Sequence, residues 1–261
     1  MKAAVISDVH GNSPALRAVL DDIRSHGIDE LICLGDVVNG PDPRGSLELL
    51  LEWPAARCIK GNADMYLCVE RLEEFPWQDR PPWHWLVPTL TEWREAIGPE
   101  LLAQVAAWPD ELVVDDAWMV HDTPLELMAA GTAAADLPEG YRLLTYHANG
   151  LVPRSPPHVY AANAAAVRTR GLRQLFFGHT HMPFVREEGG VTFCNAGSAG
   201  MPLDGDPRAS WISWGEAGLG IRRVAYDIAA ALELTARNVK DPERRKNYER
   251  MFPTGRHWRY A

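Results

Sequence analysis

Five short apolar runs in this chain each lead into polar residues that can bind metal ions, and this pattern constrains the fold more than any other. The runs lie in AAVISDVH, LICLGD, RCIKGN, WMVH and QLFFGHTH, and the polar residues are Asp8, His10, Asp36, Asn62, His121, His179 and His181. Short, wholly apolar runs are typical of strands buried on both faces of a sheet. In an α/β sheet, functional side chains gather outside the carboxyl ends of the strands. The sequence therefore predicts an α/β fold in which these residues meet at one edge.

Helices are predicted between the first strands. Ser13 is suited to cap a helix and Pro14 to open it, and Gly27 is suited to end it. Apolar residues recur at helical spacing between these limits, at Leu16, Val19, Leu20 and Ile23. The same reasoning predicts a helix at 46–52 and strands at 3–6, 31–34 and 57–59. Strands that alternate with helices indicate an α/β sheet.

Later strands follow one another more closely. They are predicted at 118–120, 174–177, 191–194, 209–214 and 220–227. Tight turns such as Glu188-Gly189-Gly190 indicate antiparallel pairing and a second sheet. A helix is predicted from Ile228, and the tail from Lys240 to Tyr260, rich in Arg and Lys, is predicted to be a solvated terminal helix. The whole chain, residues 1–261, is predicted to be one domain.

The segment from about residue 70 to 110 differs from its surroundings. It is rich in proline and tryptophan, with Trp77, Trp83, Trp85, Trp93 and Trp108. Helices are predicted at 90–97 and 100–108, and no strand is predicted there. We interpret this segment as a helical insertion or lid, in which the tryptophans pack the insertion against the rest of the fold.

Composition limits the function classes. The chain has 261 residues, of which 46% are hydrophobic, and its net charge is −9. This charge argues against a general nucleic-acid binder, which needs a basic face, but allows small anionic substrates beside a bound metal. The four cysteines form no CxxC pair, and Cys33, Cys58 and Cys194 lie in apolar runs. No signal peptide or long apolar span is present, so a reducing cytoplasmic setting without membrane association is expected.

The spacing and the chemistry of the polar residues point to metal binding. Residues two apart in an extended segment point the same way, so Asp8 and His10 can address one centre. His179 and His181 can do the same, or can each bind a different ion if the chain turns at Gly178. Seven ligands are too many for one zinc ion and suit two ions that share a carboxylate. Imidazole, carboxylate and amide ligands favour Mn, Fe, Zn or Co over calcium. Any one of these residues alone would more often be a turn residue or a helix cap.

The ordered motifs resemble those of one enzyme family. DxH at 8–10, GD at 35–36, GN at 61–62, His121 and GHTH at 178–181 are similar in order and spacing to the calcineurin-like metallophosphoesterases, over residues 3 to 215. GPDP at 40–43 and NAGSAGMPLDGDPRASW at 195–211 further resemble a bacterial branch of predicted phosphodiesterases or diadenosine-tetraphosphatase-like proteins.

This resemblance implies a four-layer α/β/β/α sandwich with two divalent metal ions at one edge. Manganese is the first candidate, with iron, zinc, cobalt or nickel as alternatives. Asp8, His10 and His181 would hold one ion, Asn62, His121 and His179 would hold the other, and Asp36 would bridge them. A metal-bridging hydroxide would attack the phosphorus of a phosphodiester or phosphoanhydride. The expected substrate is a small phosphorylated compound, derived from a nucleotide, and homo-oligomer formation stays open.

Two departures from the family pattern bear on the chemistry. Many members carry histidine after the GN asparagine, where it assists the leaving group, and this chain has Ala63. Losing a positioned acid costs about 10²–10⁴-fold in rate where protonation is needed, so Ala63 favours diesters or anhydrides with good leaving groups. Asp64 is then expected to do no more than cap a helix. Asp122 stands where relatives carry glycine, and is expected to support a metal ligand or to narrow the substrate space.

Further catalytic candidates lie outside the seven ligands. Asn12 is a candidate donor to a phosphate oxygen, although a turn asparagine is an equal alternative, and Arg44 is a weaker candidate that is more simply an exposed loop arginine. His84 and His147 are candidates to replace the missing acid. Two other functions stay open: a catalytically weak metal-binding regulatory or scaffold protein on the same fold, and a nuclease.

Overall fold

The computed structural model describes residues 2–54, 56–68, 86–123, 151–216 and 218–257. The helices in these ranges are α1 (Ser13–Ser25), α2 (Pro43–Leu51), α3 (Asn62–Cys68), α4 (Leu86–Ile97), α5 (Pro99–Ala106), α7 (Pro157–Thr169), α8 (Ile228–Asn238) and α9 (Pro242–Thr254). The strands are β1 (Ala3–Ile6), β2 (Glu30–Cys33), β3 (Ala56–Cys58), β4 (Glu111–Val114), β5 (Ala117–Val120), β6 (Gln174–Phe177), β7 (Phe184–Glu188), β8 (Val191–Asn195), β9 (Ala209–Gly215) and β10 (Gly218–Val224).

The strands form two five-stranded sheets. The first sheet has the order β10-β9-β1-β2-β3, and the second has the order β4-β5-β6-β8-β7. β1, β2 and β3 run parallel, and so do β5, β6 and β8. β9, β10, β4 and β7 add antiparallel pairs at the sides of these parallel cores. Each sheet is therefore mixed. The parallel strands are interior in the second sheet, whereas in the first sheet the parallel strand β3 forms one edge.

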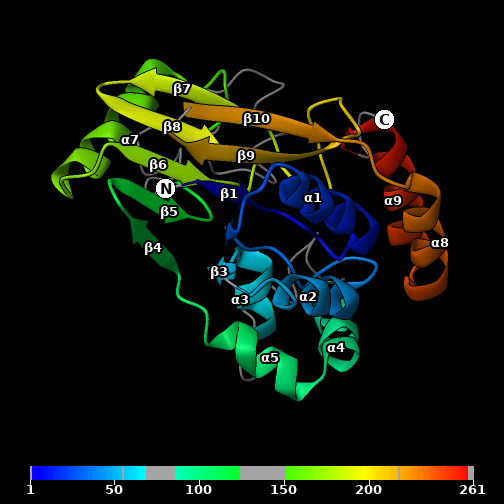
Figure 1. Cartoon of the computed structure of the whole chain (residues 1–261). Helices are drawn as coiled ribbons and strands as arrows, with labels where there is room; N and C mark the ends of the chain where they lie inside the picture. Colours follow the sequence, from blue (N-terminus) through cyan, green and yellow to red (C-terminus); the bar gives the residue numbers. More distant parts are fainter. Residues whose placement is uncertain (1, 55, 69–85, 124–150, 217, 258–261) are drawn as a thin grey trace.

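The two sheets pack face to face, and helices cover their outer faces (Figure 1). Alternation along the strands decides which layer each residue enters. In β1, Ala3 and Val5 face the core between the sheets, whereas Ala4 and Ile6 face the core that includes α1 and α2. In β6, Phe176 faces the core between the sheets, whereas its neighbours Leu175 and Phe177 face α7. This arrangement is the four-layer α/β/β/α sandwich predicted from the sequence.

The first helix shows how closely the sequence defines an element. α1 buries Leu16, Val19, Leu20 and Ile23, which are the residues predicted to form its apolar face. Its cap differs from the prediction, because Asn12, and not Ser13, accepts the hydrogen bond from the backbone N–H of Ala15 at 3.2 Å. Asn12 has φ −96° and ψ 76°, outside the helical region, so its side chain is in the N-cap position and reaches the free N–H groups.

The region predicted as an insertion is helical where the structure describes it. α4 and α5 occupy 86–106, and the partly buried Trp93 and Trp108 pack against the core beside α2. Trp77, Trp83 and Trp85 lie outside the described residues. The role of a lid, and the treatment of the chain as one domain, stay predictions.

The C-terminal tail is less solvated than predicted. α9 ends at Gly255, a residue with positive φ, as is common at helix ends. Met251 and Phe252 are buried, with exposed fractions of 7% and 1%. α9 packs on α8, which in turn lies against α1. Among the described helices, none combines the length and the apolarity needed to cross a bilayer.

Candidate metal centre

All seven predicted ligands lie together at one edge of the two sheets. Asp8 and His10 follow β1, Asp36 follows β2, and Asn62 begins α3 after β3. His121 follows β5, and His179 and His181 follow β6. The first sheet therefore supplies four of these residues and the second sheet supplies three, so the cluster spans the junction between the sheets.

The first half of the cluster contains Asp8, His10 and His181. The Nε2 atoms of His10 and His181 are 3.0 Å apart. The Oδ1 atom of Asp8 is 3.5 Å from Nε2 of His10 and 3.2 Å from Nε2 of His181. Two imidazole nitrogens and one carboxylate oxygen thus surround a single point, which is the donor set of a transition-metal site.

The second half contains Asn62, His121 and His179. The Oδ1 atom of Asn62 is 3.1 Å from Nε2 of His121 and 2.9 Å from Nδ1 of His179. The two imidazole nitrogens are 3.3 Å apart. An amide oxygen is a neutral ligand, so this half collects three donors without adding negative charge.

Asp36 lies between the two halves. Its Oδ2 atom is 3.7 Å from Nε2 of His10 and 3.6 Å from Nε2 of His121. Its Oδ1 atom accepts a hydrogen bond from the backbone N–H of Ala63 at 2.8 Å. That bond fixes the carboxylate and leaves Oδ2 directed at both halves.

Hydrogen bonds on the far side of the rings fix which nitrogen faces the cluster. Nδ1 of His121 is 2.8 Å from the carbonyl oxygen of Leu34, and Nδ1 of His181 is 2.6 Å from that of Met201. A carbonyl oxygen only accepts, so both Nδ1 atoms carry the hydrogen and both Nε2 atoms offer a lone pair when the ring is neutral. His179 faces the cluster through Nδ1 instead, and its Nε2 atom is 3.7 Å from Oδ2 of Asp122.

The buried groups of the cluster fit a divalent cation. Asp8 is fully buried, and its Oδ1 atom has no hydrogen-bond donor among the described residues. An ionised carboxylate oxygen is costly in that state unless a cation balances it. Nδ1 of His10 is also 2.7 Å from the amide oxygen of Asn39, so the facing Nε2 atoms of His10 and His181 both present lone pairs, which repel at 3.0 Å. A bound cation would remove both costs.

The electrostatic field of the cluster favours positive charge. Burial works against protonation of His121, but the negative charges of Asp36 and Asp8 raise its pKa to about 9. Burial likewise opposes ionisation of Asp8, but the charge of His181 and the closeness of the His10 and His181 imidazoles hold its pKa well below the usual value. The same field that attracts protons attracts a metal ion, so metal and protons compete for this site.

The backbone at the cluster is unusual. Asp8, His10, Asp36, His179 and His181 all have positive φ, between 47° and 63°. Asp115 is the other non-glycine residue in this conformation among the described residues. Such backbone costs of order 1–3 kcal/mol per residue and persists where the surrounding structure imposes it. The loops after the strands thus turn sharply in order to aim their side chains at the centre.

The glycines of the GD and GN motifs allow two loops to cross. A Cβ atom on Gly35 would lie 2.1 Å from the backbone nitrogen of Gly61, and one on Gly61 would lie 2.2 Å from Oδ1 of Asp36. No side chain fits at either position. The two glycines bring the Asp36 loop against the Asn62 loop, and the two ligands approach each other for this reason.

Asp64 has a role in the site that was not predicted from the sequence. It was expected only to cap a helix, but its fully buried carboxylate accepts four backbone N–H bonds. The donors are Asp36 at 2.7 Å, Val37 at 3.0 Å, Val38 at 3.2 Å and Gly61 at 2.9 Å. Burial and the charge of Asp36 raise its pKa to about 6. Asp64 holds both ligand loops, and its place two residues after the GN asparagine was the available signal.

The remaining candidates fare differently. Asn12 is buried, and its amide donates to the carbonyl oxygen of Gly200 at 2.7 Å while its oxygen caps α1, so both ends of the amide have partners in the fold and its role as a phosphate donor stays a prediction. Arg44 lies in the first turn of α2, not in a loop, and pairs with Glu48 at 2.8 Å. His84 and His147 lie outside the described residues.

Comparison with known proteins decides the family. Residues 1–213 match the model of the calcineurin-like phosphoesterase superfamily domain. The chain belongs to this superfamily. It is 29% identical to the uncharacterized protein MJ0912 of Methanocaldococcus jannaschii, over 90% of this chain and 92% of that protein.

Solved structures agree with this membership. A metallophosphoesterase from Sphaerobacter thermophilus is 25% identical, with a TM-score of 0.70 over 98% of this chain and 100% of its own. The hypothetical protein PH1004 from Pyrococcus horikoshii shares the fold, with a TM-score of 0.73 at 19% identity over 95% of this chain and 97% of its own. The cluster is thus a set of candidate metal-binding residues in a member of a phosphoesterase superfamily.

Proposed function

We propose that this protein is a phosphoesterase that binds two divalent metal ions and hydrolyses phosphodiester or phosphoanhydride bonds. The observation that carries the proposal is the position of Asp36, whose Oδ2 atom lies within 3.7 Å of imidazole nitrogens from both halves of the cluster. A carboxylate shared in this way suits two ions better than one. The superfamily membership supports the reaction class.

The chain's residues divide into two ligand sets under this proposal. Asp8, His10 and His181 would hold one ion, Asn62, His121 and His179 would hold the other, and Asp36 would be shared by both. When bound, the ions supply Lewis-acid activation of water and charge stabilisation on the phosphoryl oxygens. The mixture of imidazole, carboxylate and amide donors suits Mn, Fe, Zn or Co, and we propose manganese as the first candidate.

Several other groups position this machinery. The N–H of Ala63 orients Asp36 through Oδ1, and Asp64 holds the backbone that carries it. Asp122, whose Oδ2 atom is 3.7 Å from Nε2 of His179, adds negative charge at the rim of the site. This charge disfavours dianionic monoesters, which agrees with the substrate class inferred from Ala63. We propose a small phosphorylated substrate, derived from a nucleotide, for the same site.

The test is hydrolysis of bis-p-nitrophenyl phosphate with and without Mn²⁺. The wild-type protein should turn over the diester only with metal, and Asp36→Asn should lower kcat by at least about 10²-fold. Asp21→Asn, on the exposed face of α1, makes the same chemical change far from the cluster and should behave as wild type. Metal-independent turnover, or equal turnover in Asp36→Asn, would exclude this mechanism.

The missing acid at position 63 is tested with a series of leaving groups. Ala63 is 5% exposed, so inserting a histidine would disturb its packing and give an ambiguous result. Aryl phosphodiesters with increasingly basic leaving groups test the same point without mutation. The rate should fall by about 10²-fold or more from p-nitrophenol to phenol, because no positioned acid protonates the departing oxygen. A flat dependence would show that another residue supplies the proton.

A further inference from the structure

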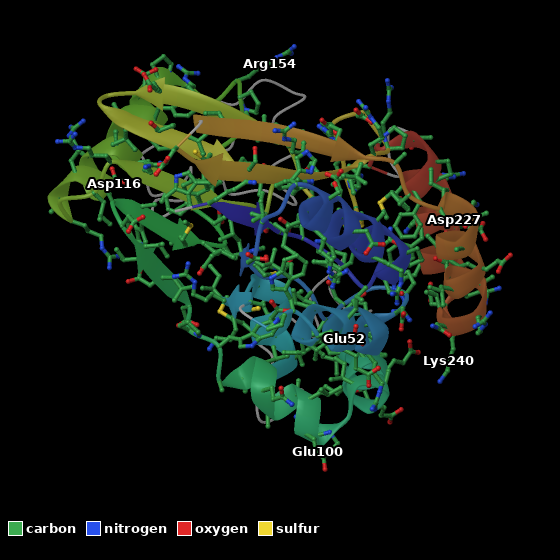
Figure 2. All side chains as sticks on the ribbon, viewed as in Figure 1. Glu52, Glu100, Asp116, Arg154, Asp227 and Lys240 are labelled. Carbon is green, nitrogen blue, oxygen red and sulfur yellow. The ribbon has the colours of Figure 1, made fainter. Side chains whose placement is uncertain are left out.

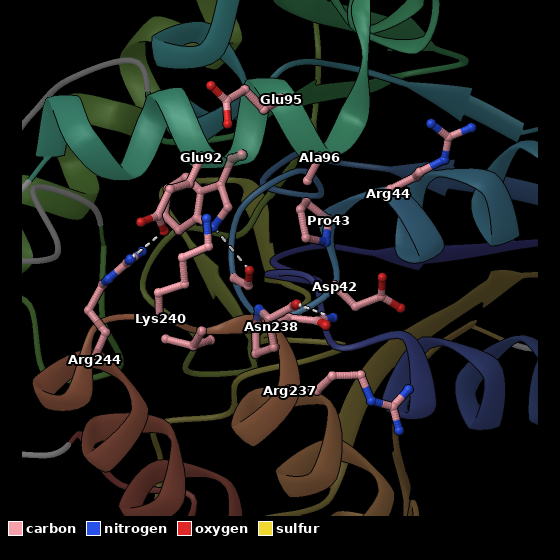
Figure 3. Close-up of a pocket in the computed structure, with 14 residues that line it drawn as sticks. Asp42, Pro43, Arg44, Glu92, Glu95, Ala96, Arg237, Asn238, Lys240 and Arg244 are labelled. Atoms are coloured by element: carbon pink, nitrogen blue, oxygen red, sulfur yellow. Dashed lines mark hydrogen bonds and ion pairs between the residues drawn. The ribbon is translucent and has the colours of Figure 1, made fainter.

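A separate cavity lies between α2, α4 and the segment that joins α8 to α9 (Figure 3). Its volume is about 570 Å³, within the range of sites that bind small molecules. None of the seven metal-cluster residues lines it. Residues 237–244, which form one wall, lie beyond the part of the chain that matches the superfamily domain. The cavity is therefore built by adding C-terminal helices to the family core.

The cavity is richer in positive charge than the chain as a whole. Arg44, Arg237, Lys240 and Arg244 line it together with three acidic residues, in a chain of net charge −9. Two of the acids are already engaged. Asp42 caps α2 and accepts a hydrogen bond from Ser13, and Glu92 pairs with Arg244 at 2.7 Å.

The charged side chains of the cavity that have no partner favour the binding of an anion. Arg237 and Lys240 have no hydrogen-bond or ion-pair partner among the described residues, whereas Glu95 is the one acid of the lining without one there. In Figure 3 the carboxylate of Glu95 lies on the far side of α4 from Arg237 and Lys240. In Figure 3 the guanidinium of Arg237 points away from Lys240, so Lys240 is the unpaired cation that remains on this wall, and its ammonium group is suited to a phosphate.

Trp93 gives the cavity an aromatic wall. Its indole is half-buried, and its Nε1 atom donates to the carbonyl oxygen of Gly40 at 3.0 Å, so the ring is fixed. A fixed indole with cations beside it offers apolar and stacking surface for a planar ring. We propose that this cavity binds a small ligand that carries both a phosphate group and an aromatic ring, as a nucleoside monophosphate does.

The cavity is separate from the metal centre but adjoins it through one segment. Asn39 contacts His10 at 2.7 Å, and the backbone N–H of Asp42 donates to the carbonyl oxygen of Gly11 at 2.8 Å. On the cavity side, Asn238 donates to the carbonyl oxygen of Pro41 at 3.0 Å. The segment 39–42 therefore has one side toward His10 and the other toward the proposed ligand.

Isothermal titration of the full-length protein with AMP tests the proposal. After chelation of the metal, AMP should bind with one site per chain, and inorganic phosphate should bind more weakly because it lacks the ring. Arg237→Ala/Lys240→Ala should weaken AMP binding by at least about tenfold, since charge-assisted hydrogen bonds are lost. Asp36→Asn should leave AMP affinity unchanged, because Asp36 is not part of the cavity.

Arg154→Ala/Arg222→Ala is the matched control. It removes two exposed cations elsewhere, and Arg154 lies on the opposite side of the molecule from Lys240 in Figure 2. AMP affinity should be unchanged in this variant. The proposal is overturned if AMP fails to bind at millimolar concentration. It is also overturned if binding is lost in Asp36→Asn and kept in Arg237→Ala/Lys240→Ala, because AMP would then occupy the metal centre. Neither result bears on the diester hydrolysis, which is measured separately.

Discussion

At the scale of single residues, the metal centre depends on the seven ligands and on the residues that hold their loops, of which Asp64 makes four backbone hydrogen bonds. Asp8 and His181 are visible in the sequence because each follows an apolar run in a motif of metal-binding type. Asp64 is not visible in this way, since its role depends on N–H groups that belong to a loop 26 to 28 residues earlier. Asn12 lies close to the ligands in sequence, and its amide oxygen forms the cap of α1 that was predicted for Ser13.

Asp64→Asn should loosen both ligand loops. The amide replaces two acceptor oxygens with one and turns an NH₂ group toward backbone N–H donors, so unfolding free energy should fall by about 2–4 kcal/mol. Mn²⁺ affinity should fall by about 10–100-fold, as for other residues that hold metal ligands in place. Urea denaturation and metal titration measure the two effects, with Asp21→Asn as the control. Unchanged metal affinity in a folded variant would show that Asp64 acts on stability alone.

Metal binding should release protons near neutral pH. His121 has a pKa of about 9 without metal, so it is protonated below that pH and must lose its proton to become a ligand. The apparent affinity for Mn²⁺ should therefore decrease as the pH falls from 9 to 6. Calorimetry at pH 7 in two buffers of different ionisation enthalpy should show release of about one proton or more. Equal binding enthalpies in the two buffers would contradict this.

At the scale of elements, the sequence predicted strongly patterned segments and missed weak ones. α1 and β6 have clear apolar patterns and were predicted. β4 and β7 were missed because they lie at the sides of a sheet and carry exposed polar residues, as in FVREE. α7 was missed because its alanines blur the division between its faces, although it buries Val159, Tyr160 and Val167.

The cap of α1 permits a test that separates structure from catalysis. Asn12→Ala should lower unfolding free energy by about 1–3 kcal/mol, because it removes the cap and leaves the carbonyl oxygen of Gly200 without its donor. Asn12→Asp keeps the cap but not the bond to Gly200. Its unfolding free energy, measured by urea denaturation, should lie between those of wild type and Asn12→Ala. KM for bis-p-nitrophenyl phosphate should stay within about twofold in Asn12→Asp, as expected for a residue that does not touch substrate. A tenfold rise in KM would support Asn12 as a substrate contact.

At the scale of the whole molecule, the centre joins two sheets that also pack together through their apolar faces. Met119 and Phe176 of one sheet pack against Val5 and Ile32 of the other in the layer between them. The sequence predicted two sheets, but their relative placement follows from packing, which no single segment encodes. The ligands from both sheets lie together because this core fixes the sheets against each other.

Metal should therefore stabilise the fold as a cross-link between its halves. At a free Mn²⁺ concentration 100 times Kd, unfolding free energy should increase by about 2.7 kcal/mol for each independent site. Thermal denaturation with and without Mn²⁺ measures this, with NaCl at equal ionic strength as the control. Asp36→Asn should reduce the gain, since it removes the ligand that contacts both halves. An equal gain in wild type and Asp36→Asn would show that Mn²⁺ acts elsewhere.

The left-handed backbone at five of the ligands has a consequence for protein engineering. Copying the seven side chains onto another α/β sheet would not transfer the centre, because ordinary loops hold such residues with negative φ. A transplant would need the loops themselves, with the crossing glycines and the buried carboxylate that secures them. The same backbone conformation limits which residues can replace a ligand to give an inactive protein with undisturbed loops. Asparagine tolerates this conformation and preserves the backbone, whereas a β-branched residue would distort the loop as well as remove the ligand.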